Sequence, residues 1–397
     1  MKIAYLVSEF PGISHTFILR EIEELKKNNV EVVTVSINNP QNLEKMDEKE
    51  RLYYNSTLYL KREFKKNILK YFFKIFTLQG VNIFFSTMKL NYFKGPKSLL
   101  KTIGYFLEEL VLLTYLKKLE VTHVHIHFAN PAASLLLPIN KHTDIDYSLS
   151  VHGPEIFYNT DKNLLEEKFK DAVFIRGIGF FCRSQIMRFL ETKQWEKVHM
   201  VPCGVDPEIY SRSQLPKNEI VNIVSVGRLT PSKGQIIILK ALKRLVKKGV
   251  DFKLNIIGGG VDDSLLKSYT KENDLESYIN FLGVRSREET KEILKDMDIF
   301  TLPSFAEGIP VSLMEAMSME IPVVSTAING IPELIQNDKN GYLVMPSDIE
   351  GLSEIFEKLI LDDVLRKKIG QEGRKIIKNK YNIYKSADKM VELFKTY

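Results

Sequence analysis

The sequence SFAEGIPVSLMEAMSMEIPVVSTAINGIPELIQNDKNGYLV, residues 304–344, predicts two successive transitions from a loop into a helix. Residues 311–319 have helical composition, and residues 321–327 form a short β-branched run that is typical of a buried parallel strand. Gly330 and Pro332 end one segment and start the next, since proline suits the first turn of a helix.

Each of these loops leads to a helix N-terminus, where backbone N–H groups lack intrahelical partners and favour anions such as phosphate. Glu307 lies on the first loop and Glu315 on the helix that follows it. Carboxylates do not bind phosphate, so if both face a ligand they should accept hydrogen bonds from its hydroxyl groups. A ligand with phosphates and hydroxyl groups is a nucleotide sugar. The alternative from the spacing alone is that both glutamates only solvate the surface.

The same residues carry a resemblance to a known family. Glu307, seven intervening residues and Glu315 resemble the E-x7-E signature of retaining glycosyltransferases of the GT-B fold, group 1 type. In that family the first glutamate lies beside the donor sugar and the second binds the nucleotide ribose. The resemblance therefore implies a catalytic role for Glu307 and a nucleotide-binding role for Glu315. It also assigns Gly308, Ile309 and Pro310 to the donor diphosphate.

The composition sets the scale of the protein. A chain of 397 residues, of which 44% are hydrophobic and 27% charged, is long enough for two globular domains. The two cysteines, Cys182 and Cys203, support no disulfide framework and fit a reducing compartment. Neither a signal peptide nor an uninterrupted run of 18 apolar residues is recognisable, so we expect a cytoplasmic protein.

Residues 61–101 contain ten basic residues and the single acidic residue Glu63, with nine Phe or Tyr residues among them. A basic, aromatic, amphipathic segment suits an anionic membrane surface, which would associate the protein with the inner face of the membrane. The alternative is a core helix with a solvated basic face. No signature of a nucleic-acid-binding module accompanies the charge, so no nucleic acid is expected as a partner.

The N-terminal residues predict a parallel α/β sheet. Residues 2–7 form an apolar run, residues 16–28 repeat apolar side chains at helical spacing, and residues 30–37 form a second strand-like run. The loop after the first strand is where such a sheet binds ligands.

This loop belongs to SEFPGISHTFILREIEEL, residues 8–25, which resembles the opening of glycosyltransferases that build bacterial surface polysaccharides. Many of these have a Gly-Gly pair where this chain has only Gly12. The resemblance places Gly12 and His15 on the acceptor or sugar side of the site.

Three histidines alternate in VTHVHIHF, residues 121–128, so His123, His125 and His127 share one face of a predicted strand. Imidazoles are common metal ligands, but no nearby carboxylate or cysteine cluster completes a coordination shell. Hydrogen bonding is the alternative role. Relatives have similar histidine-rich strand ends without a metal, so the resemblance implies no metal and places His127 on the acceptor or sugar side.

His152 follows a strand-like run and precedes Gly153 and Pro154. At that position it could meet a ligand hydroxyl directly, although a lone histidine is more often structural. It resembles the Thr-x-His-Gly element of the family, whose histidine lies against the transferred sugar. The resemblance makes His152 a catalytic candidate.

The pattern of strand, loop and helix starts again at residues 220–226. The following loop, GRLTPSKG at residues 227–234, offers Arg228 as a planar fork and Lys233 as a point charge to a diphosphate. It resembles the family's diphosphate-binding element. The alternative is solvated surface charge.

Further along, LNIIGGG at residues 254–260 ends in glycines that allow a ligand to approach the backbone, which makes Gly258 a nucleotide-binding candidate. It does not satisfy G-x-G-x-x-G. Relatives hold the nucleobase near the positions of Val284 and Arg285.

The resemblance implies an α/β protein of the GT-B fold with two facing Rossmann-like parallel α/β domains. Residues 1–206 would bind the acceptor, residues 207–375 the nucleotide sugar, and residues 376–397 would form a helix that packs back on the first domain. The expected reaction is retaining, metal-independent and cofactor-free transfer of a sugar from a UDP- or GDP-sugar. The acceptor would be a hydroxyl of a glycan or lipid-linked molecule in surface polysaccharide biosynthesis, such as lipopolysaccharide or capsule. The alternatives are a GT-B nucleotide-sugar epimerase, a phosphorylase, or a non-catalytic nucleotide-binding membrane scaffold.

Overall fold

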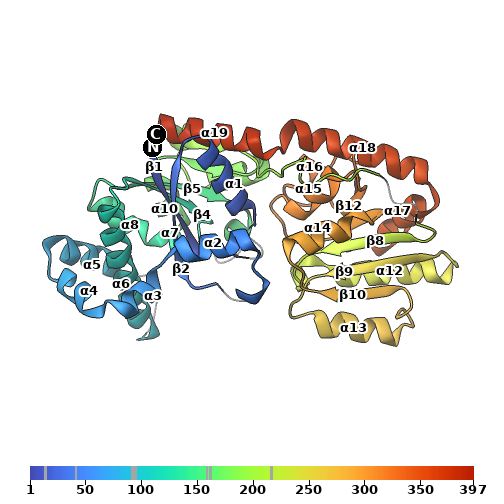
Figure 1. Cartoon of the computed structure of the whole chain (residues 1–397), viewed down its shortest axis with the longest axis horizontal. Helices are drawn as coiled ribbons and strands as arrows, with labels where there is room; N and C mark the ends of the chain where they lie inside the picture. Colours follow the sequence, from blue (N-terminus) through green and yellow to red (C-terminus); the bar gives the residue numbers. More distant parts are fainter. Residues whose placement is uncertain (13–15, 41–42, 91–95, 158–159, 161–162, 215–217) are drawn as a thin grey trace. The chain divides into compact units, whose positions relative to one another are not determined.

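The computed structural model describes residues 1–12, 16–40, 43–90, 96–157, 160, 163–214 and 218–397 (Figure 1). These residues form two compact units. Unit 1 consists of Met1–Val201 together with Ala387–Tyr397, and unit 2 of Pro202–Ser386. Each unit contains its own parallel sheet and several helices, which confirms the expected α/β class.

Unit 1 has a seven-stranded parallel sheet with the order β3-β2-β1-β4-β5-β6-β7. The strands expected at residues 2–7 and 30–37 are present as β1 and β2. Leu6 and Val7 of β1 are buried, as expected for the central strand of a parallel sheet. The strands are β1 (Lys2–Glu9), β2 (Glu31–Asn38), β3 (Leu58–Tyr59), β4 (His123–His127), β5 (Asp146–Val151), β6 (Ile175–Gly177) and β7 (Val198–Met200).

The helices of unit 1 alternate with these strands, except for a group of four that follows β3. Figure 1 shows this group, α3 to α6, at one end of the unit. The helices are α1 (Thr16–Lys27), η1 (Leu43–Lys45), α2 (Glu48–Ser56), α3 (Leu60–Lys66), α4 (Ile68–Ile75), α5 (Leu78–Leu90), α6 (Pro96–Lys118), α7 (Pro131–Ser134), α8 (Leu136–Lys141), α9 (Pro154–Phe157), α10 (Leu165–Asp171), α11 (Phe180–Met187) and η3 (Thr192–Lys197).

The order of strands in unit 1 reverses at β1, with β2 and β3 on one side and β4 to β7 on the other. Parallel sheets bind ligands at such a reversal, outside the carboxyl ends of the two central strands. These ends are the loop after β1, which contains Gly12, and the end of β4, which is His127.

Unit 2 has a six-stranded parallel sheet with the order β10-β9-β8-β11-β12-β13. Its order reverses at β8, so the loops after β8 and β11 are the corresponding ligand-binding position. The strands expected at residues 220–226 and 321–327 are present as β8 and β12. The strands are β8 (Val221–Val226), β9 (Phe252–Ile257), β10 (Ile279–Gly283), β11 (Ile299–Leu302), β12 (Val323–Thr326) and β13 (Tyr342–Val344).

The helices of unit 2 bury their apolar faces against this sheet. Ile238, Leu242 and Leu245 recur on one face of α12 and are fully buried in the core of the unit. The helices are η4 (Pro231–Lys233), α12 (Gln235–Lys247), α13 (Asp263–Glu272), α14 (Arg287–Lys295), α15 (Val311–Ser318), α16 (Ile331–Leu334), α17 (Ile349–Leu361) and α18 (Asp363–Lys380), followed by α19 (Ile383–Thr396), most of which belongs to unit 1.

Candidate functional site

The loops after β8 and β11 close on each other in unit 2. Gly234, at the end of the first loop, has a φ of +66°, and a Cβ there would collide with the carbonyl oxygen of Pro303. The backbone N–H of Phe305 donates a hydrogen bond to the carbonyl oxygen of Ser232 (2.8 Å). Glycine at position 234 therefore allows the two loops to meet.

Lys233 and Glu307 form an ion pair across this junction, in which the Nζ of Lys233 donates to the Oε1 of Glu307. The hydroxyl of Ser304 donates to the same carboxylate oxygen (2.8 Å). Only 18% of the Lys233 side chain and 10% of the Glu307 side chain is exposed. The structure thus brings together a residue predicted to bind the diphosphate and one predicted to lie beside the sugar.

Gly258 lies against the start of the β8 loop. Its φ is +146°, and a Cβ there would collide with the carbonyl oxygen of Gly227. The N–H of Gly227 donates to the carbonyl of Ile257 (3.0 Å), and the N–H of Leu229 donates to that of Gly259 (3.0 Å). A side chain at position 258 would displace the β8 loop, so this glycine holds the turn after β9 beside the loop that carries Arg228.

Arg228 and Arg285 are both exposed but differ in their contacts. Within the described ranges, the guanidinium of Arg228 has no hydrogen-bond or ion-pair partner, while its carbonyl oxygen accepts a hydrogen bond from the side chain of Gln235 (2.9 Å). Arg285 lies 3.7 Å from the carboxylate of Glu289, and among the residues that the structure describes it forms no ion pair with another predicted site residue. Val284 is exposed beside the turn after β9. Arg228 is therefore the arginine whose charge is open to an anionic ligand.

Gly308, Ile309 and Pro310 lead into α15 and are buried. Pro310 is the N-cap residue, and no side chain of the described segments caps this helix end, so its first N–H groups can be offered to an anion. The start of α16 packs directly on this loop, since a Cβ on Gly330 would lie 2.6 Å from the carbonyl oxygen of Gly308. Glu315 follows within α15 and is half-buried.

In unit 1, His127 ends β4 and His152 directly follows the neighbouring strand β5. The Nδ1 of His127 lies 3.0 Å from the Nε2 of His152, and the two rings stack with centroids 5.1 Å apart. The backbone N–H of His152 donates to the Oε1 of Glu155 (2.8 Å). The structure therefore joins these two candidates. Gly12 lies in the loop after β1 of the same sheet, and His15 lies outside the described residues.

Beneath this histidine pair, Glu21 of α1 is buried together with Arg176 of β6. The carboxylate of Glu21 accepts hydrogen bonds from an N–H of Arg176 and from the hydroxyl of Tyr5 (2.8 Å), and its Oε1 lies 3.4 Å from the Nε2 of His127. Burial disfavours the charged form of Glu21, but Arg176 and His127 outweigh burial and hold the pKa of Glu21 well below its usual range. Burial lowers the pKa of His127, so this imidazole is neutral near pH 7.

This arrangement favours one assignment of the imidazole protons. A neutral imidazole carries one N–H, and in His127 the proton is best placed on Nε2, where it faces the carboxylate of Glu21. The Nδ1 of His127 then accepts a hydrogen bond from the Nε2–H of His152. If His152 is neutral, its single proton is then on Nε2, and its Nδ1 is the nitrogen that can accept a hydrogen bond. Glu21 therefore acts on His152 through His127.

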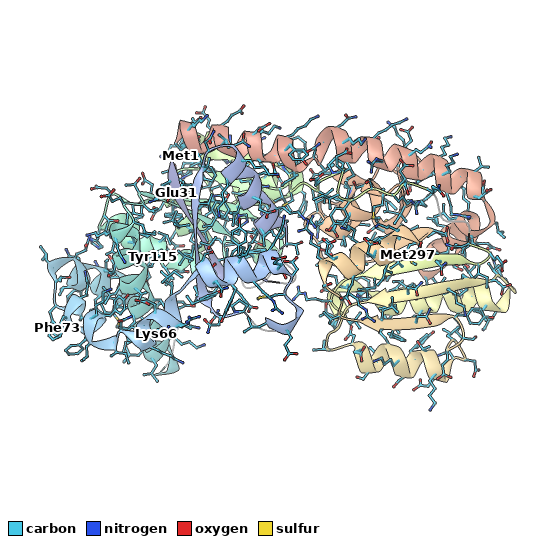
Figure 2. All side chains as sticks on the ribbon, viewed as in Figure 1. Met1, Glu31, Lys66, Phe73, Tyr115 and Met297 are labelled. Atoms are coloured by element: carbon cyan, nitrogen blue, oxygen red, sulfur yellow. The ribbon has the colours of Figure 1, made fainter. Side chains whose placement is uncertain are left out.

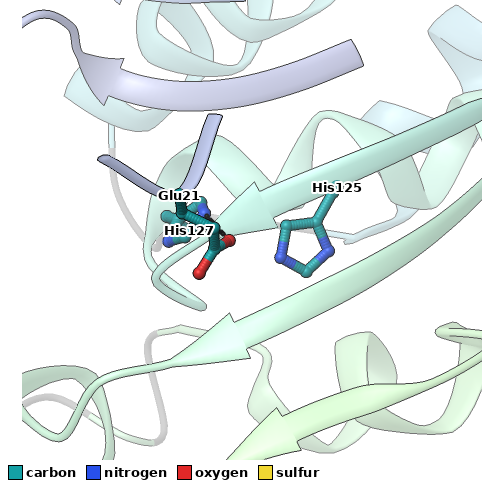
Figure 3. Close-up of side chains that lie close together, drawn as sticks. All are labelled: Glu21, His125 and His127. Atoms are coloured by element: carbon teal, nitrogen blue, oxygen red, sulfur yellow. Dashed lines mark ion pairs between the residues drawn. The ribbon is translucent and has the colours of Figure 1, made fainter. Parts of the chain in front are cut away.

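Glu21, His125 and His127 are also close enough to be considered as metal ligands, with one donor atom from each lying within 4.8 Å of the others (Figure 3). However, the two ring nitrogens of His125 lie 2.7 Å and 2.8 Å from the hydroxyls of Ser148 and Ser150. Glu21 is already paired with the guanidinium of Arg176, whose positive charge would repel a cation. These contacts favour a hydrogen-bonded cluster over a metal centre.

Sequence reasoning did not single out Glu21 or Arg176. The available signal was a charged residue on an apolar face: Glu21 lies between Ile18 and Leu25 on the buried side of α1. A buried charge needs a partner. Residues that are 155 positions apart cannot be paired from local sequence patterns.

Residues 207–376 match the family model described as Glycosyl transferases group 1. The amylovoran biosynthesis glycosyltransferase AmsK of Erwinia amylovora is 37% identical over 171 residues, which are 41% of this chain and 42% of AmsK. The UDP-Gal:alpha-D-GlcNAc-diphosphoundecaprenol alpha-1,3-galactosyltransferase of Escherichia coli is 29% identical over 212 residues, 50% of this chain and 54% of that enzyme. The capsular polysaccharide biosynthesis glycosyltransferase CapM of Staphylococcus aureus is 28% identical over 249 residues, 61% and 63% of the two chains. The chain thus spans less than two thirds of each of these relatives.

Among solved structures, Anabaena Alr3699/HepE in complex with UDP-glucose matches the whole of both chains with a TM-score of 0.76 at 16% identity. At this identity the likeness concerns the fold alone. It confirms the expected α/β fold of the GT-B type.

Proposed function

We propose that the chain, whose residues 207–376 match the family model of the group 1 glycosyl transferases, transfers a sugar from a nucleoside diphosphate sugar to a hydroxyl group, with retention of the anomeric configuration. The acceptor is a glycan or lipid-linked molecule in surface polysaccharide biosynthesis. The similarity to AmsK and CapM, glycosyltransferases of amylovoran and capsular polysaccharide biosynthesis, supports this choice of pathway class. The observation that carries the proposal is the meeting of the Lys233 and Glu307 loops where the unit 2 sheet reverses its strand order.

The donor is held by unit 2. The diphosphate is bound by the guanidinium of Arg228, the Nζ of Lys233 and the backbone N–H groups at the start of α15, where Gly308 and Ile309 lead into the helix. Glu315 accepts hydrogen bonds from the ribose hydroxyls. The glycine turn at Gly258, with Val284 and Arg285 beyond it, accommodates the nucleobase. The complex of HepE with UDP-glucose supports a UDP-sugar as the first donor to test.

Transfer breaks the bond between the anomeric carbon and a diphosphate oxygen. A new bond forms from the acceptor oxygen to the same face of the carbon, and the acceptor proton passes to the leaving phosphate oxygen. Cationic groups at the diphosphate stabilise the negative charge that develops there, and removing one such group typically costs about 10²–10³ in kcat. Arg228 and Lys233 fill this role without a metal ion or another cofactor.

Each unit also offers a side chain for sugar hydroxyl groups. Glu307, held by Ser304 and Lys233, accepts from the sugar hydroxyls and stabilises positive charge at the anomeric carbon. The proposed role of His152 is to contact a hydroxyl of a sugar substrate. Gly12 and His127 are assigned to the acceptor or sugar side, as is His15 from its position in the sequence alone.

Calorimetric titration tests the donor site. UDP-glucose, UDP-galactose, UDP-N-acetylglucosamine and GDP-mannose are titrated without added metal into the full chain, into Arg228→Ala and into Lys240→Ala. Lys240 is an exposed cation of α12 with no role in the site, so its variant controls for the loss of one charge. We expect one donor to bind, Arg228→Ala to weaken it by about tenfold or more, and Lys240→Ala to leave it unchanged.

The preferred donor is then assayed with candidate acceptors, and the anomeric configuration of the product is determined by NMR, with and without EDTA. Inversion at the anomeric carbon contradicts the retaining mechanism, and loss of activity with EDTA contradicts metal independence. The absence of binding by every nucleotide sugar and by free UDP and GDP contradicts the proposed function as a whole.

A further inference from the structure

The helix α5 has two apolar faces, and only one of them is covered. Gly80, Ile83 and Thr87 form its buried face. Thr87 donates to the carboxylate of Glu109 on α6 (2.5 Å), which anchors this face inside the unit. The opposite face carries Leu78, which is 80% exposed, and Phe85, which is 63% exposed. A helix that is apolar all round is normally covered on both sides.

The neighbouring helix α4 is even less buried, since Tyr71 is its one buried residue. Leu69, Phe72, Phe73 and Phe76 follow one another at helical spacing and are between 51% and 76% exposed. The rings of Phe72 and Phe76 contact each other edge to face, with centroids 5.4 Å apart. The described part of residues 61–101 forms separate helices, and Phe72, Phe73 and Phe76 are exposed, whereas the alternative of a core helix would have buried them.

We define the outer face as the surface formed by six exposed residues of this region: Leu69, Phe72, Phe73, Phe76, Leu78 and Phe85. The two helices that carry it pack against each other and against α6, so the face lies on one continuous group of helices (Figure 1). Side chains of this size exposed to this degree present on the order of 100 Å² each. The outer face therefore reaches the upper end of the roughly 300–600 Å² that is usual for the largest apolar patch of a soluble protein, and patches of this size often mark interaction sites.

The charge around the outer face has one sign. Lys65 and Lys66 end α3, Lys70 and Lys74 lie on α4, and Lys89 lies near the end of α5; all five are exposed. Within the described residues none of them forms an ion pair, and the one carboxylate of α3 to α5, that of Glu63, accepts hydrogen bonds from Asn67 and Tyr71. Figure 2 shows Phe73 and Lys66 on the outer side of this group of helices.

We propose that the outer face and its five lysines bind the surface of an anionic lipid bilayer, with α4 and α5 lying along the interface. Phenylalanine and leucine side chains enter the boundary between headgroups and acyl chains, while the lysines contact the anionic headgroups. The unbalanced positive charge favours this partner over a second copy of the same face, because two copies would bring like charges together. The proposal does not depend on sugar transfer.

The geometry favours a helix pair that lies on the bilayer. No single helix in the described part of the chain is long and apolar enough to span a membrane, and α4 and α5 pass that test only as a pair bent by 85°. The buried face of α5 is held inside unit 1 by Thr87 and by Ser86, whose hydroxyl lies 2.7 Å from the Nε2 of His142. Insertion of α5 across a bilayer would break these contacts, whereas binding at the surface preserves them.

Cosedimentation with vesicles tests the proposal. The full chain is mixed with vesicles of phosphatidylcholine alone and with vesicles that contain 30% phosphatidylglycerol, at low and at high salt. We expect it to sediment with the anionic vesicles, with binding reduced by high salt. Phe72→Ser/Phe73→Ser/Phe76→Ser should reduce binding at least tenfold. Each lysine near an anionic surface contributes about fivefold, so Lys65→Gln/Lys66→Gln/Lys70→Gln/Lys74→Gln should reduce it by two orders of magnitude or more.

Two control variants carry matched changes on exposed positions of unit 2. Leu265→Ser/Leu361→Ser/Val364→Ser removes three exposed apolar side chains, and the quadruple change to Gln at Lys240, Lys271, Lys367 and Lys368 removes the same number of lysines. Both should bind vesicles like the unchanged chain. Since every changed side chain is exposed, all variants should unfold at about the same temperature, which circular dichroism verifies.

Three results would overturn the proposal. The first is that the unchanged chain does not sediment with anionic vesicles, and the second is that it binds neutral vesicles equally well. The third is that the phenylalanine variant binds as tightly as the unchanged chain. Sedimentation velocity without lipid adds a fourth: a dimer of the unchanged chain that the phenylalanine variant does not form would assign the outer face to a second copy of the protein.

Discussion

The Nζ of Lys233 donates a hydrogen bond to the Oε1 of Glu307, so two residues 74 positions apart form a largely buried ion pair at the centre of the candidate donor site. Within this pair the carboxylate balances the charge of the lysine. If the proposed function is correct, a diphosphate that binds Lys233 must share it with Glu307. The carboxylate would then weaken diphosphate binding while it positions the sugar, and the two roles can be separated by substitution.

Glu307→Gln should lower kcat and strengthen the binding of free UDP or GDP. The amide keeps the size of the side chain, but it no longer neutralises Lys233, and it cannot stabilise positive charge at the anomeric carbon. We expect kcat to fall by about 10²–10³ and the affinity for the free nucleoside diphosphate to rise several-fold. Steady-state kinetics and calorimetry measure the two effects. Full transfer activity in this variant would refute the placement of Glu307 beside the sugar.

Glu315→Gln should weaken the binding of nucleotides but not the binding of pyrophosphate. If the carboxylate accepts from the ribose hydroxyls, its loss removes charge-assisted hydrogen bonds worth about 1.5–3 kcal/mol in total, or roughly tenfold or more in Kd. Pyrophosphate has no ribose and should bind the variant and the unchanged protein equally. Competition of both ligands against a bound nucleotide measures this difference. A parallel loss for pyrophosphate would mean that Glu315 acts through the helix and not on the ribose.

Glu21→Gln should destabilise unit 1. It leaves the guanidinium of Arg176 buried without a carboxylate, which typically costs about 3–5 kcal/mol. Urea unfolding measures the loss. Glu23→Gln on the same helix is the matched control, because Glu23 forms a partly exposed ion pair with Lys49 (3.2 Å) and its loss should cost about 1 kcal/mol or less.

The destabilisation by Glu21→Gln should also depend on pH. The pKa of Glu21 in the folded protein is well below its ordinary value of 4.5, so its contribution to stability is present above about pH 4.5 and is lost as the pH falls through the folded pKa. The difference in unfolding free energy between the two proteins should therefore shrink on acidification. A constant difference down to pH 2 would contradict a charged Glu21.

Lys168 should make the protein more stable as the pH rises above neutrality. It is fully buried, donates to the carbonyl oxygens of Ala129 (3.1 Å) and Asn130 (2.8 Å), and burial lowers its pKa to about 7. Between pH 7 and the ordinary pKa of 10.5, the unfolded chain binds a proton that the folded chain does not. The free energy of unfolding therefore gains up to about 1.4 kcal/mol per pH unit from this group.

Lys168→Met should lack this rise, whereas Lys170→Met, which changes an exposed neighbour on the same helix, should keep it. Urea unfolding of the three proteins at several pH values between 7 and 10 provides the comparison. Equal pH dependence in the unchanged protein and Lys168→Met would show that Lys168 remains charged in the folded state.

The parts of this fold that the sequence predicts are those determined by neighbouring residues. The β8 loop with Arg228 and Lys233, and the helix that starts at Val311, follow from local turn residues and apolar spacing. That the two loops meet depends on Gly234 lying under Pro303, a contact between segments far apart in the sequence. The spacing of the residues carries no information about such a contact.

Two other features show the same limit. The apolar pattern over residues 61–101 predicts an amphipathic helical segment. In the structure, breaks at Asn67 and after Phe76 separate α3, α4 and α5. Which face of α4 and α5 is exposed depends on how they pack against α6, and the pattern does not contain this information. Glu21 and Arg176 each appear in the sequence as a charged residue within an apolar element. The ion pair between them explains why both charges can be buried.

The assignment of Ala387–Tyr397 to unit 1 has a consequence for synthesis on the ribosome. Phe394 packs against Tyr5, His125 and Phe174, which all lie in the unit that begins the chain. A nascent chain that has emerged as far as Val201 therefore lacks part of the unit 1 core. Unit 2, which is continuous in sequence, can complete its own contacts first. Although it is made later, unit 2 should be the first to become resistant to protease, and unit 1 should stay sensitive until translation has passed Phe394.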